Sequence, residues 1–143
     1  MSAFELHPRL AAGGHPLGML ENCQLLLKDN AHFAWFILVP EVDVEELHEL
    51  SADEYARIGK AVRELSGFVS RHFAPDKVNV AAIGNQVRQM HVHVVGRWTS
   101  DPAWPGVVWA SEARQPYAPE EVARIVALVA GELGCGASRW GPA

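Results

Sequence analysis

The sequence predicts an α+β fold, because its strand-like segments follow one another in runs and its two helix-like segments lie apart from them. A doubly wound sheet would instead alternate strands with helices along the chain. With 143 residues, about half of them hydrophobic, the chain is long enough for a real core and too short for two ordinary domains. We therefore expect residues 1–143 to form a single domain.

Two strands are expected early in the chain, after a loop at residues 13–16. Residues 23–27 form a short apolar run. Residues 33–39 hardly alternate between polar and apolar, which is typical of a strand buried on both faces, and Pro40 ends this strand. The short turn between the two runs predicts that they pair as an antiparallel hairpin.

The clearest helix begins after Ser51, which is followed by Glu54 in the spacing of a capping box. One apolar stripe then recurs every three or four residues, at Tyr55, Ile58, Val62, Leu65 and Val69. Pro75 ends this helix. A second helix is predicted from Pro119, with Gly134 just beyond its end and a buried side at Val122, Ile125, Val129 and Leu133.

Between the helices, residues 77–83 and 89–95 indicate two more strands, with a turn at residues 84–88. Residues 89–95 alternate strictly, so successive side chains point to opposite faces. One face carries Met90, Val92 and Val94, which suit a core, and the other carries Gln89, His91 and His93. An amide and two imidazoles at spacings of about 7 Å can bind a phosphate, bind a metal, or have no function.

The whole segment from 79 to 97 resembles the signature of the histidine triad (HIT) superfamily, which is His-φ-His-φ-His-φ-φ with φ apolar, after a Gly/Gln-type turn. Gln89 replaces the first histidine, and glutamine occurs within this row in some branches of the superfamily. The resemblance implies a HIT-like fold, with a mainly antiparallel sheet, two packed helices and a two-fold homodimer.

The resemblance also implies a nucleotide hydrolase or nucleotidyl transferase that acts at the α-phosphate of a nucleoside phosphoramidate or dinucleoside polyphosphate. The middle histidine of the family forms a nucleotidyl-histidine, and that role falls on His91, since a neutral imidazole nitrogen is nucleophilic near neutral pH. His93 would line the phosphate site, and Gln89 would serve as a neutral donor and acceptor. No metal or other cofactor is expected.

Five further positions are candidate substrate-binding residues on the same resemblance. Asn85 and Gln86 occupy places where the family has a glutamine and a hydroxyl residue that contact the phosphate or leaving group. Asn79 would help to order the phosphate site, or is an exposed strand residue. Asp29 would bind ribose hydroxyls, or is a plain turn aspartate. Arg97 would neutralise a phosphate, or forms a salt bridge at the rim of the sheet.

Departures from the family pattern keep other functions open. Trp35 stands where the family often has a further histidine, and with Gln89 and Gln86 it favours a non-catalytic nucleotide-binding protein. A metal site is a third hypothesis, in which His32 or His7 joins the two strand histidines. Three tryptophans, Trp98, Trp104 and Trp109, either line a base-stacking pocket or bury a dimer or C-terminal interface.

Charge and composition limit the partners. The net charge is −5 and no run of Lys and Arg forms a stripe, which argues against a nucleic-acid binder but not against a small nucleotide substrate. The start of the chain lacks the features of a signal peptide, and the longest apolar run is too short to cross a bilayer. We expect a cytoplasmic protein without membrane partners, whose two cysteines, Cys23 and Cys135, stay reduced.

Overall fold

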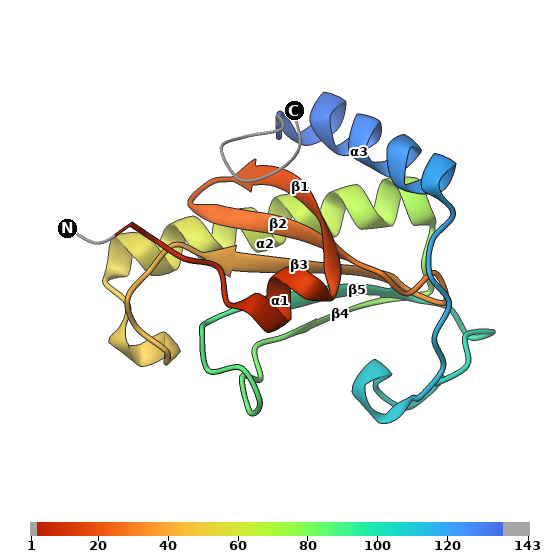
Figure 1. The fold of residues 1–143 in the computed structure, drawn as a ribbon, viewed down its shortest axis with the longest axis horizontal. Coiled ribbons are helices and arrows are strands. Elements are labelled where there is room, and N and C mark those ends of the chain that lie inside the picture. The colour runs from red at the N-terminus through yellow and green to blue at the C-terminus, as the bar shows by residue number, and fades with distance from the viewer. Residues whose placement is uncertain (1–2, 136–143) are drawn as a thin grey trace.

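The computed structural model describes residues 3–135, and its centre is a five-stranded antiparallel sheet (Figure 1). The strands lie in the order β1-β2-β3-β5-β4, and every neighbouring pair is antiparallel. Their bounds are β1 Gly14–Leu20, β2 Cys23–Lys28, β3 Ala34–Pro40, β4 Lys77–Ala81 and β5 Val92–Arg97. This arrangement confirms the predicted α+β class and the antiparallel β2–β3 hairpin.

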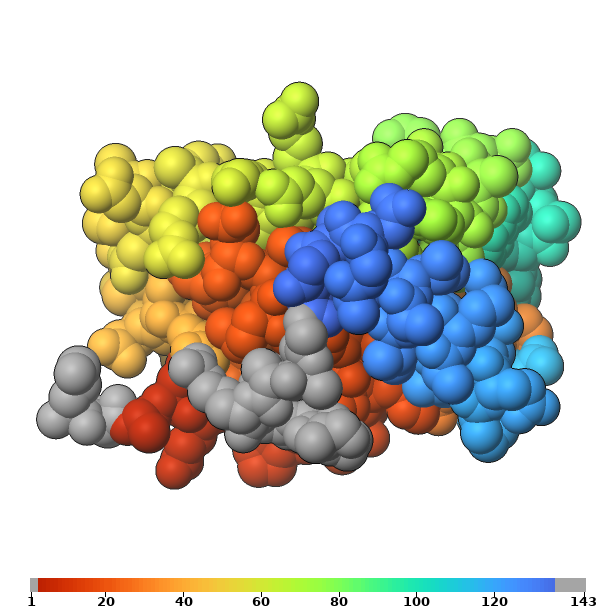
Figure 2. Space-filling view, turned by 90° about the horizontal axis from the view of Figure 1, so that it is seen from above, coloured from red at the N-terminus to blue at the C-terminus, as the bar shows by residue number. Residues whose placement is uncertain are grey.

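Helices cover the two faces of the sheet unequally. The long α2 (Ala52–Phe73) and α3 (Pro119–Leu133) share one face, where α2 contacts β3 and β5 and α3 contacts β1. Seen from above, α3 lies beside α2 and over the first strands (Figure 2). The short α1 (Pro8–Ala12) lies on the opposite face (Figure 1). Two single-turn 3₁₀ helices, η1 (Leu47–Glu49) and η2 (Val108–Ala110), lie in connecting segments.

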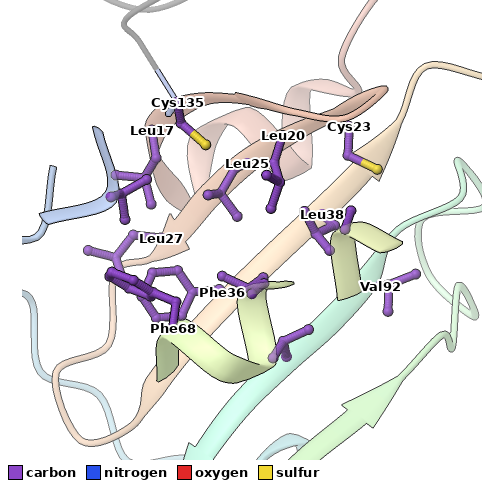
Figure 3. Packing of buried hydrophobic residues seen from close by; sticks show 14 of the residues in the cluster. Leu17, Leu20, Cys23, Leu25, Leu27, Phe36, Leu38, Phe68, Val92 and Cys135 are labelled. Carbon is purple, nitrogen blue, oxygen red and sulfur yellow. The ribbon is translucent and has the colours of Figure 1, made fainter. Parts of the chain in front are cut away.

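Strand β3 separates two hydrophobic clusters, because alternate side chains of a strand point to opposite faces. Ala34, Phe36 and Leu38 belong to the cluster between the sheet and the long helices. Figure 3 shows Phe36 and Leu38 within it. Trp35, Ile37 and Val39 belong to a second cluster on the other face. All seven residues of β3 are buried, as the lack of alternation predicted. The second cluster forms the apolar floor of the candidate site described below.

Helix α2 begins as predicted. The Ser51 hydroxyl accepts a hydrogen bond from the Glu54 backbone N–H, and the Glu54 carboxylate accepts one from the Ser51 backbone N–H. The predicted stripe is buried at Ile58, Leu65 and Val69, but Tyr55 is 59% exposed, so its place in that stripe was wrong. Helix α3 also begins at Pro119 as predicted, and Gly134 follows it in the left-handed conformation, with φ of 69°.

Strand β1 corrects the prediction of a loop at residues 13–16. Gly14, His15 and Pro16 already pair with β2, and a bulge between Pro16 and Gly18 interrupts the register. Glycine and proline argue against a central strand, but both are tolerated at a sheet edge and at bulges, and β1 lies at an edge. The turn chemistry of this segment therefore concealed an edge strand.

The last two strands also differ from their predicted bounds. β4 ends at Ala81 instead of residue 83, and β5 begins at Val92, so Gln89 precedes the strand. Met90, Val92 and Val94 lie in the main core, which confirms their predicted face. β4 forms the other edge of the sheet in residues 3–135, and its Val80 is 49% exposed. The homodimer stays a prediction.

Two further sequence expectations concern cysteines and membranes. Cys23 and Cys135 are both buried, unpaired thiols, and burial raises the pKa of the first to about 12 and of the second to about 11. Within residues 3–135, each helix is too short or too polar to span a bilayer.

Candidate functional site

An open pocket of about 420 Å³ lies on the α1 side of the sheet. Its floor comes from β3 and β5, and its walls come from α1, the β4–β5 connection and the segment that follows β5. The two motif histidines, His91 and His93, both line it. Their rings are close neighbours, with centroids 5.0 Å apart. The structure thus brings the predicted pair of imidazoles into one concave site.

The His91 ring is fixed by the backbone of its own motif. Its Nδ1 lies 2.7 Å from the carbonyl oxygen of Gln89. A carbonyl oxygen can only accept, so Nδ1 carries the proton in this bond. In the neutral imidazole the lone pair is therefore on Nε2. A nucleophilic or metal-binding nitrogen is available only on that side of the ring.

The His93 ring is held with its proton on Nε2, the opposite nitrogen from His91. Trp35 Nε1 donates to His93 Nδ1 at 3.0 Å, and an indole N–H cannot accept. Nδ1 of His93 is therefore unprotonated, and the neutral ring carries its proton on Nε2. Burial, together with the nearby His91 and Lys28, lowers the pKa of His93 to about 3. His93 is a neutral hydrogen-bond donor over the physiological pH range.

The three tryptophans after β5 have different surroundings. Trp109 lines the pocket, with its ring centroid 4.9 Å from that of His93 and 5.9 Å from that of Trp35. Trp98 instead packs on the main core and donates from Nε1 to the Phe73 carbonyl. Trp104 covers a buried arginine described below. Only Trp109 of the three lines this pocket.

Three cationic side chains line the pocket, and the sequence analysis did not single them out. They are Arg9 of α1, Lys28 at the end of β2 and Arg114 in the segment before α3. No aspartate or glutamate is among the lining residues. These positions are 19 and 86 residues apart in sequence, so no local motif marks them. Only the fold brings them together.

Gln89 has a different position from the one expected of it. Its side-chain oxygen accepts from the His7 backbone N–H at 2.8 Å, and its side-chain nitrogen donates to the Glu5 carbonyl at 2.8 Å. Gln89 does not line the pocket. Both hydrogen-bonding groups of the amide hold the segment that leads into α1, and α1 supplies Arg9 to the pocket.

Asn85 and Gln86 line the pocket next to the histidines. The Gln86 side-chain oxygen accepts a hydrogen bond from Arg9 at 3.2 Å, which connects the β4–β5 turn to α1. Gly84 precedes them with φ of 68°, a left-handed backbone conformation that residues other than glycine rarely adopt. The turn thus brings both residues to the lining of the pocket that His91 also lines.

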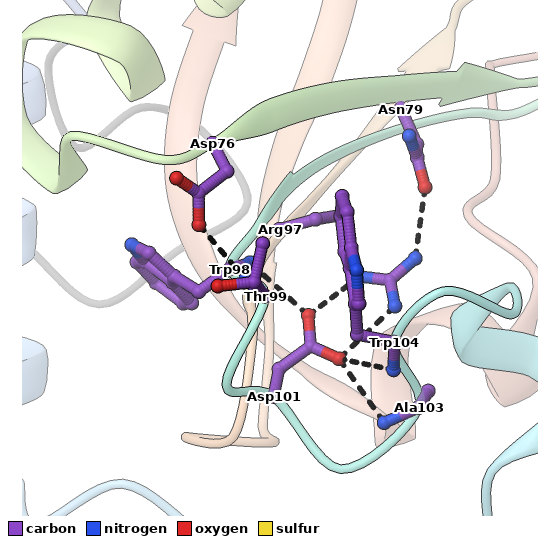
Figure 4. Close-up of polar contacts among 8 residues, drawn as sticks. All are labelled: Asp76, Asn79, Arg97, Trp98, Thr99, Asp101, Ala103 and Trp104. Carbon is purple, nitrogen blue, oxygen red and sulfur yellow. Dashed lines mark hydrogen bonds and ion pairs between the residues drawn. The ribbon is translucent and has the colours of Figure 1, made fainter.

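Asn79 and Arg97 lie outside this pocket, in a buried polar cluster at the other end of β5 (Figure 4). The Arg97 guanidinium is 1% exposed and donates to both Asp101 carboxylate oxygens, at 2.8 and 3.0 Å, and to the Asn79 side-chain oxygen at 2.9 Å. Its Cζ lies 5.6 Å from the centre of the Phe33 ring and 5.7 Å from that of the Trp104 ring. Of the two uses proposed for Arg97, the structure contains the salt bridge.

Asp29 also lies outside the lining of the pocket. Its carboxylate accepts from the Tyr117 backbone N–H at 2.9 Å and contacts His15 Nε2 at 3.0 Å. These two hydrogen bonds lower the pKa of Asp29. In this structure Asp29 ties the end of the β2 strand to the segment before α3.

The metal hypothesis lacks a ligand set in the part of the chain that the structure describes. Residues 3–135 contain no cluster of three or more His, Cys, Asp or Glu side chains arranged to hold a metal ion. Neither His7 nor His32 lines the pocket. His7 instead accepts a hydrogen bond from the Arg9 backbone N–H at the start of α1.

Comparisons with known proteins give a consistent result. The family model of the HIT domain matches residues 14–100. A histidine triad protein from Marinobacter aquaeolei is 40% identical with a TM-score of 0.88, over 93% of this chain and 98% of that one. A histidine triad protein from Sinorhizobium meliloti is 35% identical with a TM-score of 0.87, over 91% of this chain and 97% of that one. One from Bradyrhizobium japonicum is 30% identical with a TM-score of 0.88, over 92% of this chain and 99% of that one. Among curated proteins, no match was found.

Proposed function

The chain belongs to the HIT family, a membership that supports a nucleotide-binding function, and from this premise we propose that the protein cleaves nucleotides at the α-phosphate through a nucleotidyl intermediate on His91. The substrate is a nucleoside phosphoramidate or a dinucleoside polyphosphate. One observation carries the proposal: the bond from His91 Nδ1 to the Gln89 carbonyl leaves the Nε2 lone pair as the free nucleophile in a pocket lined by positive charge.

The first step forms a bond between Nε2 of His91 and the α-phosphorus. The bond from phosphorus to the leaving amine nitrogen or phosphate oxygen breaks, and the leaving group departs with that electron pair. An amine takes up a proton from water as it leaves, and the later hydrolysis returns that proton to the solvent. Because Nδ1 keeps its proton, the nucleotidylated ring is cationic, and the Gln89 carbonyl that accepts from Nδ1 stabilises this charge. Water then attacks the phosphorus, the P–N bond breaks, and neutral His91, a nucleoside monophosphate and one proton are released.

Neutral His93 contributes as a hydrogen-bond donor in this scheme. Its Nε2–H can bond a phosphoryl oxygen as negative charge builds up there in the transition state. The lowered pKa of about 3 makes it a poor source of a transferable proton near neutral pH. Asn85 and Gln86 supply amide donors from the turn beside His91.

A test of this function compares His91→Ala with His32→Gln, a substitution of a histidine outside the pocket. We expect His91→Ala to lose turnover of both substrate classes with an unchanged melting temperature, and His32→Gln to retain the wild-type rate. Equal turnover in His91→Ala and the wild type would contradict the proposal. Because His32 was a candidate metal ligand, a large loss in His32→Gln would instead support the metal hypothesis.

A non-catalytic nucleotide-binding protein is the second candidate function. The observation that favours it is Gln89, whose amide is engaged with the segment before α1 and lies away from the pocket. This candidate predicts that the wild type binds nucleotide without releasing a monophosphate. Detectable turnover that depends on His91 decides against it.

A further inference from the structure

The charge around His91 is strongly uneven. The pocket described above carries Arg9, Lys28 and Arg114 and no carboxylate. A second pocket of about 300 Å³ shares Ile83, Gly84 and His91 with the first. The charged side chains that line the second pocket are Glu45, Glu46 and Arg88, and Arg88 forms an ion pair with Glu45. A highly charged anion is therefore favoured in the first pocket over the second.

The three cations have no carboxylate partner in the part of the chain that the structure describes. Among residues 3–135, no carboxylate forms an ion pair with any of them. Arg9 donates to the neutral amide of Gln86, and Arg114 donates to the backbone carbonyls of Ser111 and Ala113. Lys28 lies 5.5 Å from the centre of the Trp35 ring. Such contacts orient the side chains and leave the full positive charge available to a ligand.

Like charges lie close together at this site. Burial and the neighbouring charge of Arg114 lower the pKa of Lys28, and the charge of Lys28 contributes to the lowered pKa of His93. A ligand with several negative charges would relieve this repulsion. A substrate with one charged phosphate needs only one cationic partner.

We propose that Arg9, Lys28 and Arg114 form a polyphosphate-binding cradle, so that the protein selects nucleotides whose leaving group carries a chain of phosphates over phosphoramidates with a single phosphate. This inference rests on the proposed function for the position of the attacked phosphorus at His91. It assigns substrate selection to three residues outside the histidine motif. The hydrogen bonds of Gln89 to residues 5 and 7 hold α1, and with it Arg9, at the cradle.

The kinetic test compares kcat/KM for adenosine phosphoramidate and for dinucleoside di-, tri- and tetraphosphates. The variants are Arg9→Gln, Lys28→Met and Arg114→Gln, and the control is Arg63→Gln, which removes the same charge from an exposed position on α2, across the sheet. Since a hydrogen bond to a charged group corresponds to about a tenfold change or more, we expect each cradle variant to lose at least about tenfold on tri- and tetraphosphates. Phosphoramidate turnover should change less than about threefold, and Arg63→Gln should match the wild type. Equal losses on both substrate classes would overturn the inference.

A binding test that needs no turnover separates this inference from the proposed function. Calorimetry at fixed ionic strength measures inorganic tripolyphosphate and orthophosphate on the wild type and on each variant. Tighter tripolyphosphate binding that weakens in the three cradle variants but not in Arg63→Gln supports the cradle, even if no substrate is hydrolysed. Turnover that depends on His91, with tripolyphosphate bound no more tightly than orthophosphate, would overturn the cradle and leave the proposed function standing.

Discussion

Trp35 Nε1 donates a hydrogen bond to His93 Nδ1 across 3.0 Å, between side chains on the adjacent strands β3 and β5. Trp35 stands at the position where HIT proteins often carry a further histidine. The indole cannot accept a proton, so it permits only the His93 tautomer with Nε2–H. A departure from the family pattern thus fixes the tautomer of His93, which lines the pocket together with His91.

Replacing Trp35 with Phe removes this donor and keeps an aromatic ring in the cluster. Both neutral tautomers of His93 then become accessible, so the Nε2–H donor is present for only part of the time. We expect kcat to fall by about tenfold, the size of one hydrogen bond to a developing charge, with little change in KM. Steady-state kinetics test this, and ¹⁵N NMR of the His93 ring reports its tautomer. An unchanged kcat with an unchanged Nδ1 signal would show that Trp35 has only a packing role.

The lowered pKa of His93 predicts a loss of stability in acid. The unfolded state protonates this ring near pH 6.5, whereas the folded state resists protonation until about pH 3. Between these values the unfolded state binds more protons, so the free energy of unfolding falls as the pH falls, by at most about 1.4 kcal/mol per pH unit from this group. Urea unfolding at several pH values between 7 and 4 should show a shallower decline in His93→Gln than in the wild type. Parallel declines would contradict the assignment to His93.

The buried ion pair between Arg97 and Asp101 predicts a large cost for losing one partner. Asp101→Ala leaves the buried guanidinium of Arg97 without a counter-charge and removes an acceptor of three backbone N–H groups. We expect a loss of about 3–5 kcal/mol in the free energy of unfolding. The matched control is Glu121→Ala, which breaks an exposed ion pair with Arg124 and should cost less than about 1 kcal/mol. Similar losses in the two variants would refute a structural role for the buried pair.

Elements with a strong local pattern were predictable from the sequence. The capping box at Ser51 marked the start of α2, and the unbroken apolar run of β3 indicated a strand buried on both faces. Strand β1 was missed because glycine and proline, which usually indicate a loop, are tolerated at its edge position and bulge. A single sequence does not show which strand lies at the edge of a sheet or contains a bulge, so it does not show where glycine and proline are tolerated.

The candidate site was predictable only in its motif. The alternation around His91 and His93 identified the two imidazoles and their shared face. The geometry of Gln89 depends on a contact with residues 5 and 7, more than eighty positions away, and no local pattern carries that information. The cations of the pocket are equally distant from the motif in sequence. Long-range contacts therefore account for the parts of the site that reasoning from the sequence missed.

The most direct test of the central claim is intact-protein mass spectrometry after brief incubation with adenosine phosphoramidate and, separately, with a dinucleoside polyphosphate. We predict a transient mass gain of one adenylyl group with each substrate that is turned over. The adduct should be absent in His91→Ala and should disappear from the wild type as water releases the monophosphate. Turnover without any adduct, at the same rate in His91→Ala as in the wild type, would contradict a nucleotidyl-histidine mechanism.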